Sequence, residues 1–141
     1  MSNMIRSVLV LLMLSITSIY ASSDAIKKVV IQVDSSNLKT QNLALNNAVN
    51  LQKFYGMDNV KVEIVAYGPG LSILTRKSKF SKRVSSLAMS DVKFSACHNT
   101  MQKIKNKTGK FPALSDGVEV VPAGVVRIVQ LEDQGYRYIR P

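Results

Sequence analysis

The sequence has a single cysteine and a single histidine among its 141 residues, and the two are neighbours, Cys97 and His98. With one cysteine no disulfide can form within the chain, so the thiol is free, joined to another molecule, or modified. One cysteine and one histidine also cannot complete a tetrahedral zinc site, which would need carboxylates or a second subunit. A hydrolytic Cys–His pair is the least favoured chemistry, because there is no second histidine and adjacent residues seldom reach each other.

Acidic side chains are scarce, since nine Asp and Glu stand against nineteen Lys and Arg, and the formal net charge is +10. Basic residues concentrate over residues 76–83 and 103–110. Both segments lack the interleaved aromatic residues of a base-stacking surface, which argues against a nucleic-acid partner. They predict a solvated basic face, with an anionic partner, membrane surface or substrate as the functional alternative.

Glycine-rich phosphate loops, internal repeats and low-complexity segments are absent from the sequence. Neither G-x-x-x-x-G-K nor G-x-G-x-x-G occurs, so the turn Gly68-Pro69-Gly70 is not a nucleotide loop. A Gly-Pro-Gly turn lets the chain reverse sharply and brings backbone close to a neighbouring crevice. We interpret it as a tight connection after a strand that also forms one wall of a site at Cys97.

The sequence also lacks a hydrophobic run long enough to span a bilayer comfortably, since a membrane helix needs about 20 apolar residues. The apolar run Ser7 to Ile19 follows Arg6 and precedes the small residue Ala21. This pattern predicts a secretory signal peptide over residues 1–21, with an uncleaved anchor as the alternative. Residues 22–141 are then one domain, periplasmic or secreted, with no stable membrane span after cleavage.

Strand-like and helix-like segments alternate along the rest of the chain. Short β-branched runs predict strands, and apolar residues at three- and four-residue spacing predict helices. This alternation predicts an α/β fold, a three-layer α/β/α sandwich with a mostly parallel sheet of about five strands. The expected strands cover residues 26–33, 60–67, 92–96, 118–121 and 136–139, and the expected helices cover residues 38–54, 71–74, 80–89, 99–107 and 123–134.

Apolar spacing also predicts which residues face the core. In the second expected strand, Val62, Ile64 and Ala66 alternate with Lys61, Glu63 and Val65. The expected core residues of the first and last long helices are Leu43, Ala44, Ala48, Leu51 and Phe54, and Val125, Val126, Ile128, Val129 and Leu131. Gly124 is expected to mark a close contact of the last helix.

Cys97 falls at the turn between an expected buried strand and an expected helix, because Asn99 and Thr100 are helix-start residues. A thiol at this turn meets unpaired backbone N–H groups, which lower its pKa and enrich the thiolate. The alternative is that Cys97 is inert packing, since free cysteine is among the most buried residue types. For His98 a solvated loop position is favoured over a proton-transfer role, because neighbouring strand residues point to opposite faces.

Four motifs in this order resemble the DsrE/DsrF-like family, in its exported single-domain branch. They are residues 68–71 (Gly-Pro-Gly-Leu), 94–101 (Phe-Ser-Ala-Cys-His-Asn-Thr-Met), 117–125 and 135–141. The resemblance implies a compact α/β/α domain that forms homo-oligomers, commonly trimers or hexamers. It also implies that Cys97, at the family's cysteine position, accepts sulfur as a persulfide, with Gly68, Pro69, Gly70, His98, Asn99 and Thr100 as neighbouring site residues.

Two functions therefore stay open. In a sulfur carrier, the Cys97 thiolate would attack a persulfide or polysulfide, hold the outer sulfur and release it to a partner thiolate by thiol exchange, with sulfur donor and acceptor proteins as the expected partners. Such a protein would need no metal or organic cofactor and would be a carrier more than a turnover enzyme. The alternative is a non-catalytic oligomeric binding module in which Cys97 is structural or ligates a metal together with groups of a neighbouring subunit.

Overall fold

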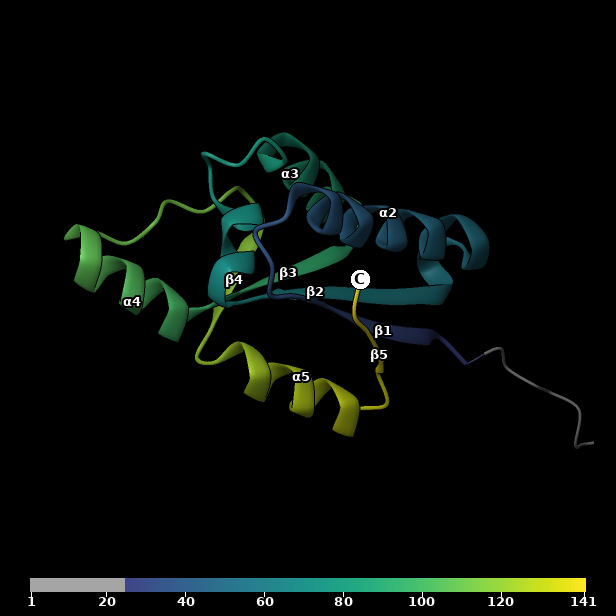
Figure 1. Ribbon diagram of the computed structural model, residues 1–141. Coiled ribbons are helices and arrows are strands. Elements are labelled where there is room, and N and C mark those ends of the chain that lie inside the picture. Colours follow the sequence, from purple (N-terminus) through teal and green to yellow (C-terminus); the bar gives the residue numbers. More distant parts are fainter. Residues whose placement is uncertain (1–24) are drawn as a thin grey trace, which may run out of the picture.

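The computed structural model describes residues 25–141, which form one five-stranded sheet with helices on both faces (Figure 1). All neighbouring strands are parallel, in the order β4-β3-β2-β1-β5. This confirms the predicted three-layer α/β/α sandwich. The strands are β1 (Lys27–Val33), β2 (Val60–Ala66), β3 (Val92–Cys97), β4 (Val118–Val121) and β5 (Arg137–Ile139).

The helices divide between the two faces of the sheet and its carboxyl edge. Helices α2 (Leu38–Tyr55) and α3 (Ser81–Met89) cover one face, and α5 (Gly124–Asp133) covers the other (Figure 1). Helix α4 (His98–Thr108) projects from the edge where β3 ends (Figure 1). Two short 3-10 helices, η1 (Met57–Asn59) and η2 (Gly68–Leu74), flank β2.

The main core lies between the sheet and helices α2 and α3. It gathers the inward residues of β1, β2 and β3 with Ala44, Leu45 and Ala48 of α2. The predicted core positions Leu43 and Phe54 were wrong, because both are exposed, Phe54 by 81%. Helix α2 lies on the sheet along a narrow stripe that begins at Gln41, and Leu43 and Phe54 fall outside that stripe.

A smaller core under α5 combines Val30 and Val65 of the sheet with Ile128 and Leu131. The other three apolar residues predicted to be buried in α5, Val125, Val126 and Val129, are about half exposed. Only one side of α5 faces the sheet, so these valines form an apolar face on the outside of the molecule.

Glu63 was expected on the side of β2 that faces away from the core. It is instead buried beneath α5, with 1% of its surface exposed. Arg127 of α5 donates a hydrogen bond of 2.7 Å to each carboxylate oxygen of Glu63, and the Ser95 hydroxyl donates a third hydrogen bond of 2.6 Å. Every oxygen of the buried carboxylate is therefore paired, as a buried charge requires. This ion pair joins α5 to β2.

Among residues 25–141, no helix combines the length and the apolar character needed to cross a bilayer. The signal peptide predicted over residues 1–21 lies outside the described residues.

Candidate functional site

Cys97 is the last residue of β3 and the N-cap of α4. It therefore lies between a strand and a helix, as predicted. Its backbone is extended, at φ −70° and ψ 114°, and its side chain is 5% exposed. The first N–H groups of a helix have no partner within the helix. A cysteine at the N-cap of α4 therefore lies beside such N–H groups, although the Asn99 N–H donates to the Pro122 carbonyl at 3.3 Å.

The thiol lies at the starts of two helices rather than one. The Thr100 side chain and the backbone N–H groups of Gly124 in α5 and of Thr100 and Asn99 in α4 act on this thiol and lower its pKa. The pairing of β3 with β4 explains the second helix, because Cys97 is in register with Val121, three residues before Gly124. The positive ends of both helix dipoles thus converge on one sulfur atom.

These donors decide the ionisation of the thiol. Burial alone acts to raise the pKa of Cys97, because it removes water from the thiolate. The hydrogen bonds from the Thr100 hydroxyl and from the Gly124, Thr100 and Asn99 N–H groups outweigh burial, so the pKa of Cys97 lies below its ordinary value. The site therefore shifts the ionisation of a nearly buried thiol toward the thiolate.

Thr100 connects the thiol to the Gly-Pro-Gly turn. The Gly68 N–H donates to the Thr100 hydroxyl oxygen at 2.9 Å, which leaves the hydroxyl hydrogen free for the sulfur. Gly70 is packed so tightly that a Cβ there would lie 2.1 Å from the Val33 carbonyl oxygen. The turn is thus held against the end of β1, and its Gly68 N–H is bonded to the Thr100 hydroxyl oxygen.

The other predicted site residues lie at the surface. Pro69, His98 and Asn99 are exposed, and Asn99 acts on the thiol through its backbone. The His98 ring lies 5.9 Å from the Phe111 ring. A solvated position was the favoured prediction for His98. Within residues 25–141 no three His, Cys, Asp or Glu side chains gather as metal ligands.

Tyr67 and the Gly124 N–H belong to the site but were not assigned to it from the sequence. A Cβ on Gly124 would lie 2.8 Å from Cδ1 and 2.9 Å from Cβ of Tyr67, so this ring closes over the start of α5. Burial, then the charges of Asp34 and Tyr138, raise the pKa of Tyr67, which stays a neutral phenol. Gly124 lies just beyond the end of β4, and Cys97 is the last residue of the neighbouring strand β3. Both residues are therefore at the carboxyl edge of the sheet, and this shared edge is the signal that could have identified the Gly124 N–H as part of the site.

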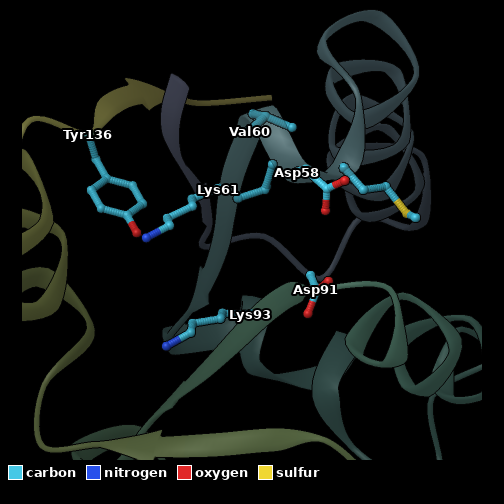
Figure 2. Close-up of a pocket in the computed structure, with 8 residues that line it drawn as sticks. Asp58, Val60, Lys61, Asp91, Lys93 and Tyr136 are labelled. Atoms are coloured by element: carbon cyan, nitrogen blue, oxygen red, sulfur yellow. The ribbon is translucent and has the colours of Figure 1, made fainter. Parts of the chain in front are cut away.

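A separate pocket of about 320 Å³ opens at the amino ends of β2 and β3, away from Cys97. Figure 2 shows the Lys61 amine directed toward the Tyr136 hydroxyl, with Lys93, Asp58 and Asp91 around the same hollow. None of these residues was a predicted site residue. The thiol and this pocket occupy opposite edges of the sheet.

Comparisons with known proteins agree with this architecture. Residues 27–141 match the model of the DsrE/DsrF-like family. A protein of unknown function, MTH1491 from Methanobacterium thermoautotrophicum, is 35% identical and aligns with a TM-score of 0.73 over 82% of this chain and 99% of that chain. The ychN protein from E. coli aligns with a TM-score of 0.65 over the same shares, and at 17% identity this likeness concerns the fold alone. No curated protein matches the sequence.

Proposed function

This chain belongs to the DsrE/DsrF-like family, and we propose that it is a sulfur carrier that holds a persulfide on Cys97. The observation that carries the proposal is the convergence of the α4 and α5 N-termini on one enclosed thiol. Thiolate, not thiol, is the nucleophile in sulfur chemistry. A cysteine that served only as a packing residue would not need these neighbouring hydrogen-bond donors.

The proposed cycle needs only this thiolate and two sulfur-bearing partners. The Cys97 thiolate attacks a sulfur atom of a donor S–S bond, a bond from Cys97 to that sulfur forms, and the rest of the donor leaves as an anion. An acceptor thiolate then attacks the outer sulfur, and the Cys97 thiolate leaves. A lowered pKa favours this second step, because a less basic thiolate is a better leaving group. No net oxidation occurs and no metal or organic cofactor takes part.

We propose that the protein works as an exported homo-oligomer, a trimer or hexamer. The family resemblance supports assembly, and the exposed valines of α5 supply an apolar face for it. Val125 of this face directly follows Gly124, whose N–H acts on Cys97, so a neighbouring subunit on α5 would lie beside the site. The pattern of residues 1–21 supports the proposal of export. The intact mass of the protein from its native host tests it, because cleavage after Ala21 would leave a chain that begins at Ser22.

Intact mass spectrometry after incubation with polysulfide tests the carrier function. The expected result is a gain of about one or more sulfur atoms, removed by a reductant and absent from Cys97→Ser. The Cys97→Ser variant should fold nearly as stably as the parent, which urea unfolding checks.

Absence of the mass gain, with slow alkylation of Cys97, would overturn the proposal. Cys97 would then be a packing residue, and the protein would be a binding module. A loss of several kcal/mol in the Cys97→Ser variant would point the same way, since losses of that size come from core defects.

A further inference from the structure

The positive charge of this protein is concentrated in two segments of the chain. Residues 76–83 and 103–116 carry nine basic side chains and one acidic side chain, Asp116. The rest of residues 25–141 carries nine basic and seven acidic side chains and is close to neutral. We call the nine the basic edge: Arg76, Lys77, Lys79, Lys82, Arg83, Lys103, Lys105, Lys107 and Lys110.

The fold brings these two segments together. The Arg76 N–H donates to the Ala113 carbonyl at 2.9 Å, and Thr75 forms a β-bridge with Leu114. A groove of about 360 Å³ between the segments has Lys77 and Lys110 in its lining. Among the described residues, Arg76 is the one member of the basic edge in an ion pair, with Asp116, so the seven lysines present unneutralised charge.

The basic edge also adjoins Cys97. Helix α4 starts beside the thiol, and Lys103, Lys105 and Lys107 follow about 9 to 15 Å along its axis at 1.5 Å per residue. The Lys105 ammonium lies 4.5 Å from the centre of the Phe111 ring, and that ring lies 5.9 Å from the ring of His98. Figure 1 shows α4 projecting from this edge of the sheet, so its lysines lie on the helix that begins at the site.

We propose that the basic edge selects anionic sulfur donors, of the class of inorganic polysulfide, for Cys97. The proposal rests on the sulfur-carrier function and names the donor that it uses. A field of one sign raises the encounter rate of an oppositely charged reactant by 10 to 1000-fold, and it reaches about 30 Å at 0.01 M salt but about 8 Å at 0.15 M. In the transfer, Cys97 takes one sulfur from the chain, and the shortened polysulfide leaves with both negative charges.

Two disulfide reagents of different charge test this inference. We would measure the reaction of Cys97 with 5,5′-dithiobis(2-nitrobenzoate), a dianion, and with neutral 4,4′-dithiodipyridine, in 10 mM and 500 mM salt. Because both reagents need the thiolate, the ratio of their rates cancels any change in the pKa of Cys97. We expect the rate with the dianion, divided by the rate with the neutral reagent, to fall about tenfold or more at high salt, because salt screens the positive charge.

A matched pair of triple variants locates the field. Replacing Lys103, Lys105 and Lys107 with Gln should lower the rate ratio about fivefold at 10 mM salt. Replacing Lys53, Lys61 and Lys93 with Gln removes the same charge from exposed positions, and Figure 2 shows Lys61 and Lys93 in the pocket at the opposite edge. This control should leave the ratio nearly unchanged.

The outcomes separate this inference from the carrier function. A rate ratio that does not depend on salt, or that falls equally in both triple variants, overturns selection by the basic edge while Cys97 still reacts with the neutral reagent. A Cys97 that reacts slowly with the neutral reagent as well overturns the carrier function, and this inference with it.

Discussion

Thr100 is the residue whose side chain acts to lower the pKa of Cys97. It can do so because the Gly68 N–H occupies its oxygen and leaves its hydrogen for the thiolate. A threonine hydroxyl in a less defined position would exchange donor and acceptor roles with water. The Gly68 N–H therefore favours the donor role of this hydroxyl toward the thiolate.

Replacing Thr100 with Val should raise the pKa of Cys97, because a donor to the thiolate is lost while burial remains. The thiolate fraction at neutral pH then falls, and alkylation slows in a rate profile against pH. Thr100→Ser keeps the hydroxyl and should keep the low pKa. An unchanged profile in Thr100→Val would show that the backbone N–H groups suffice.

The same shift predicts a pH dependence of stability. The folded state lowers the pKa of Cys97, so the ionised thiol stabilises the protein fully above the unfolded pKa of about 8.5. This contribution is lost as the pH falls through the folded pKa. The difference in unfolding free energy between the parent and Cys97→Ser should therefore grow as the pH rises toward 8.5, measured by urea unfolding. A difference that stays constant would mean an unshifted thiol.

The start of α5 depends on Gly124, where a Cβ would collide with Tyr67. Replacing Gly124 with Val should lower the free energy of unfolding by about 1 to 3 kcal/mol through overpacking. It should also raise the pKa of Cys97, because the N–H of residue 124 is displaced. Urea unfolding and the alkylation profile measure the two effects. Val125→Ala, at an exposed position in the same turn, is the control, and equal losses in both variants would contradict the predicted collision.

The Glu63–Arg127 ion pair links helix α5 to strand β2 of the sheet. Replacing Arg127 with Met leaves Glu63 buried without its partner and should cost about 3 to 5 kcal/mol of unfolding free energy. The double change Glu63→Leu with Arg127→Met should recover much of that loss, because no charge remains buried. A thermal or urea unfolding series measures both. No recovery in the double variant would show that the ion pair does more than balance its own desolvation.

The whole molecule presents an apolar face on α5 that one copy of the described chain leaves uncovered. The proposed assembly predicts that light scattering reports a trimer or hexamer, and that replacing Val126 and Val129 with Asp shifts the mass toward monomer. Met89→Asp, at a residue 82% exposed on α3, is the control that should not dissociate it. A parent protein that is already monomeric at micromolar concentration would contradict the proposed assembly.

Local sequence was enough to predict the layers and the position of Cys97. The β-branched runs gave the strands, and the Asn99-Thr100 start placed the cysteine at a helix N-terminus. The second helix N-terminus was missed, because the N–H of Gly124 reaches the thiol only through the pairing of β3 with β4. Glu63 was missed for the same reason, since its partner Arg127 is 64 residues away. Phe54 shows that apolar spacing alone does not fix the width of a buried stripe.

The place of β5 at the edge beside β1 has a consequence for how the chain folds. Strands β1 to β4 add in sequence order, each beside the one before, so this part of the sheet can grow as the chain emerges. β5 instead returns across α5 to pair Arg137 with Val29, which closes a loop of more than a hundred residues. Contacts so distant in sequence form slowly. We therefore expect α5 and β5 to pack onto the sheet last. The N–H of Gly124 would reach Cys97 only at that stage, so the thiol would gain its reactivity at the end of folding.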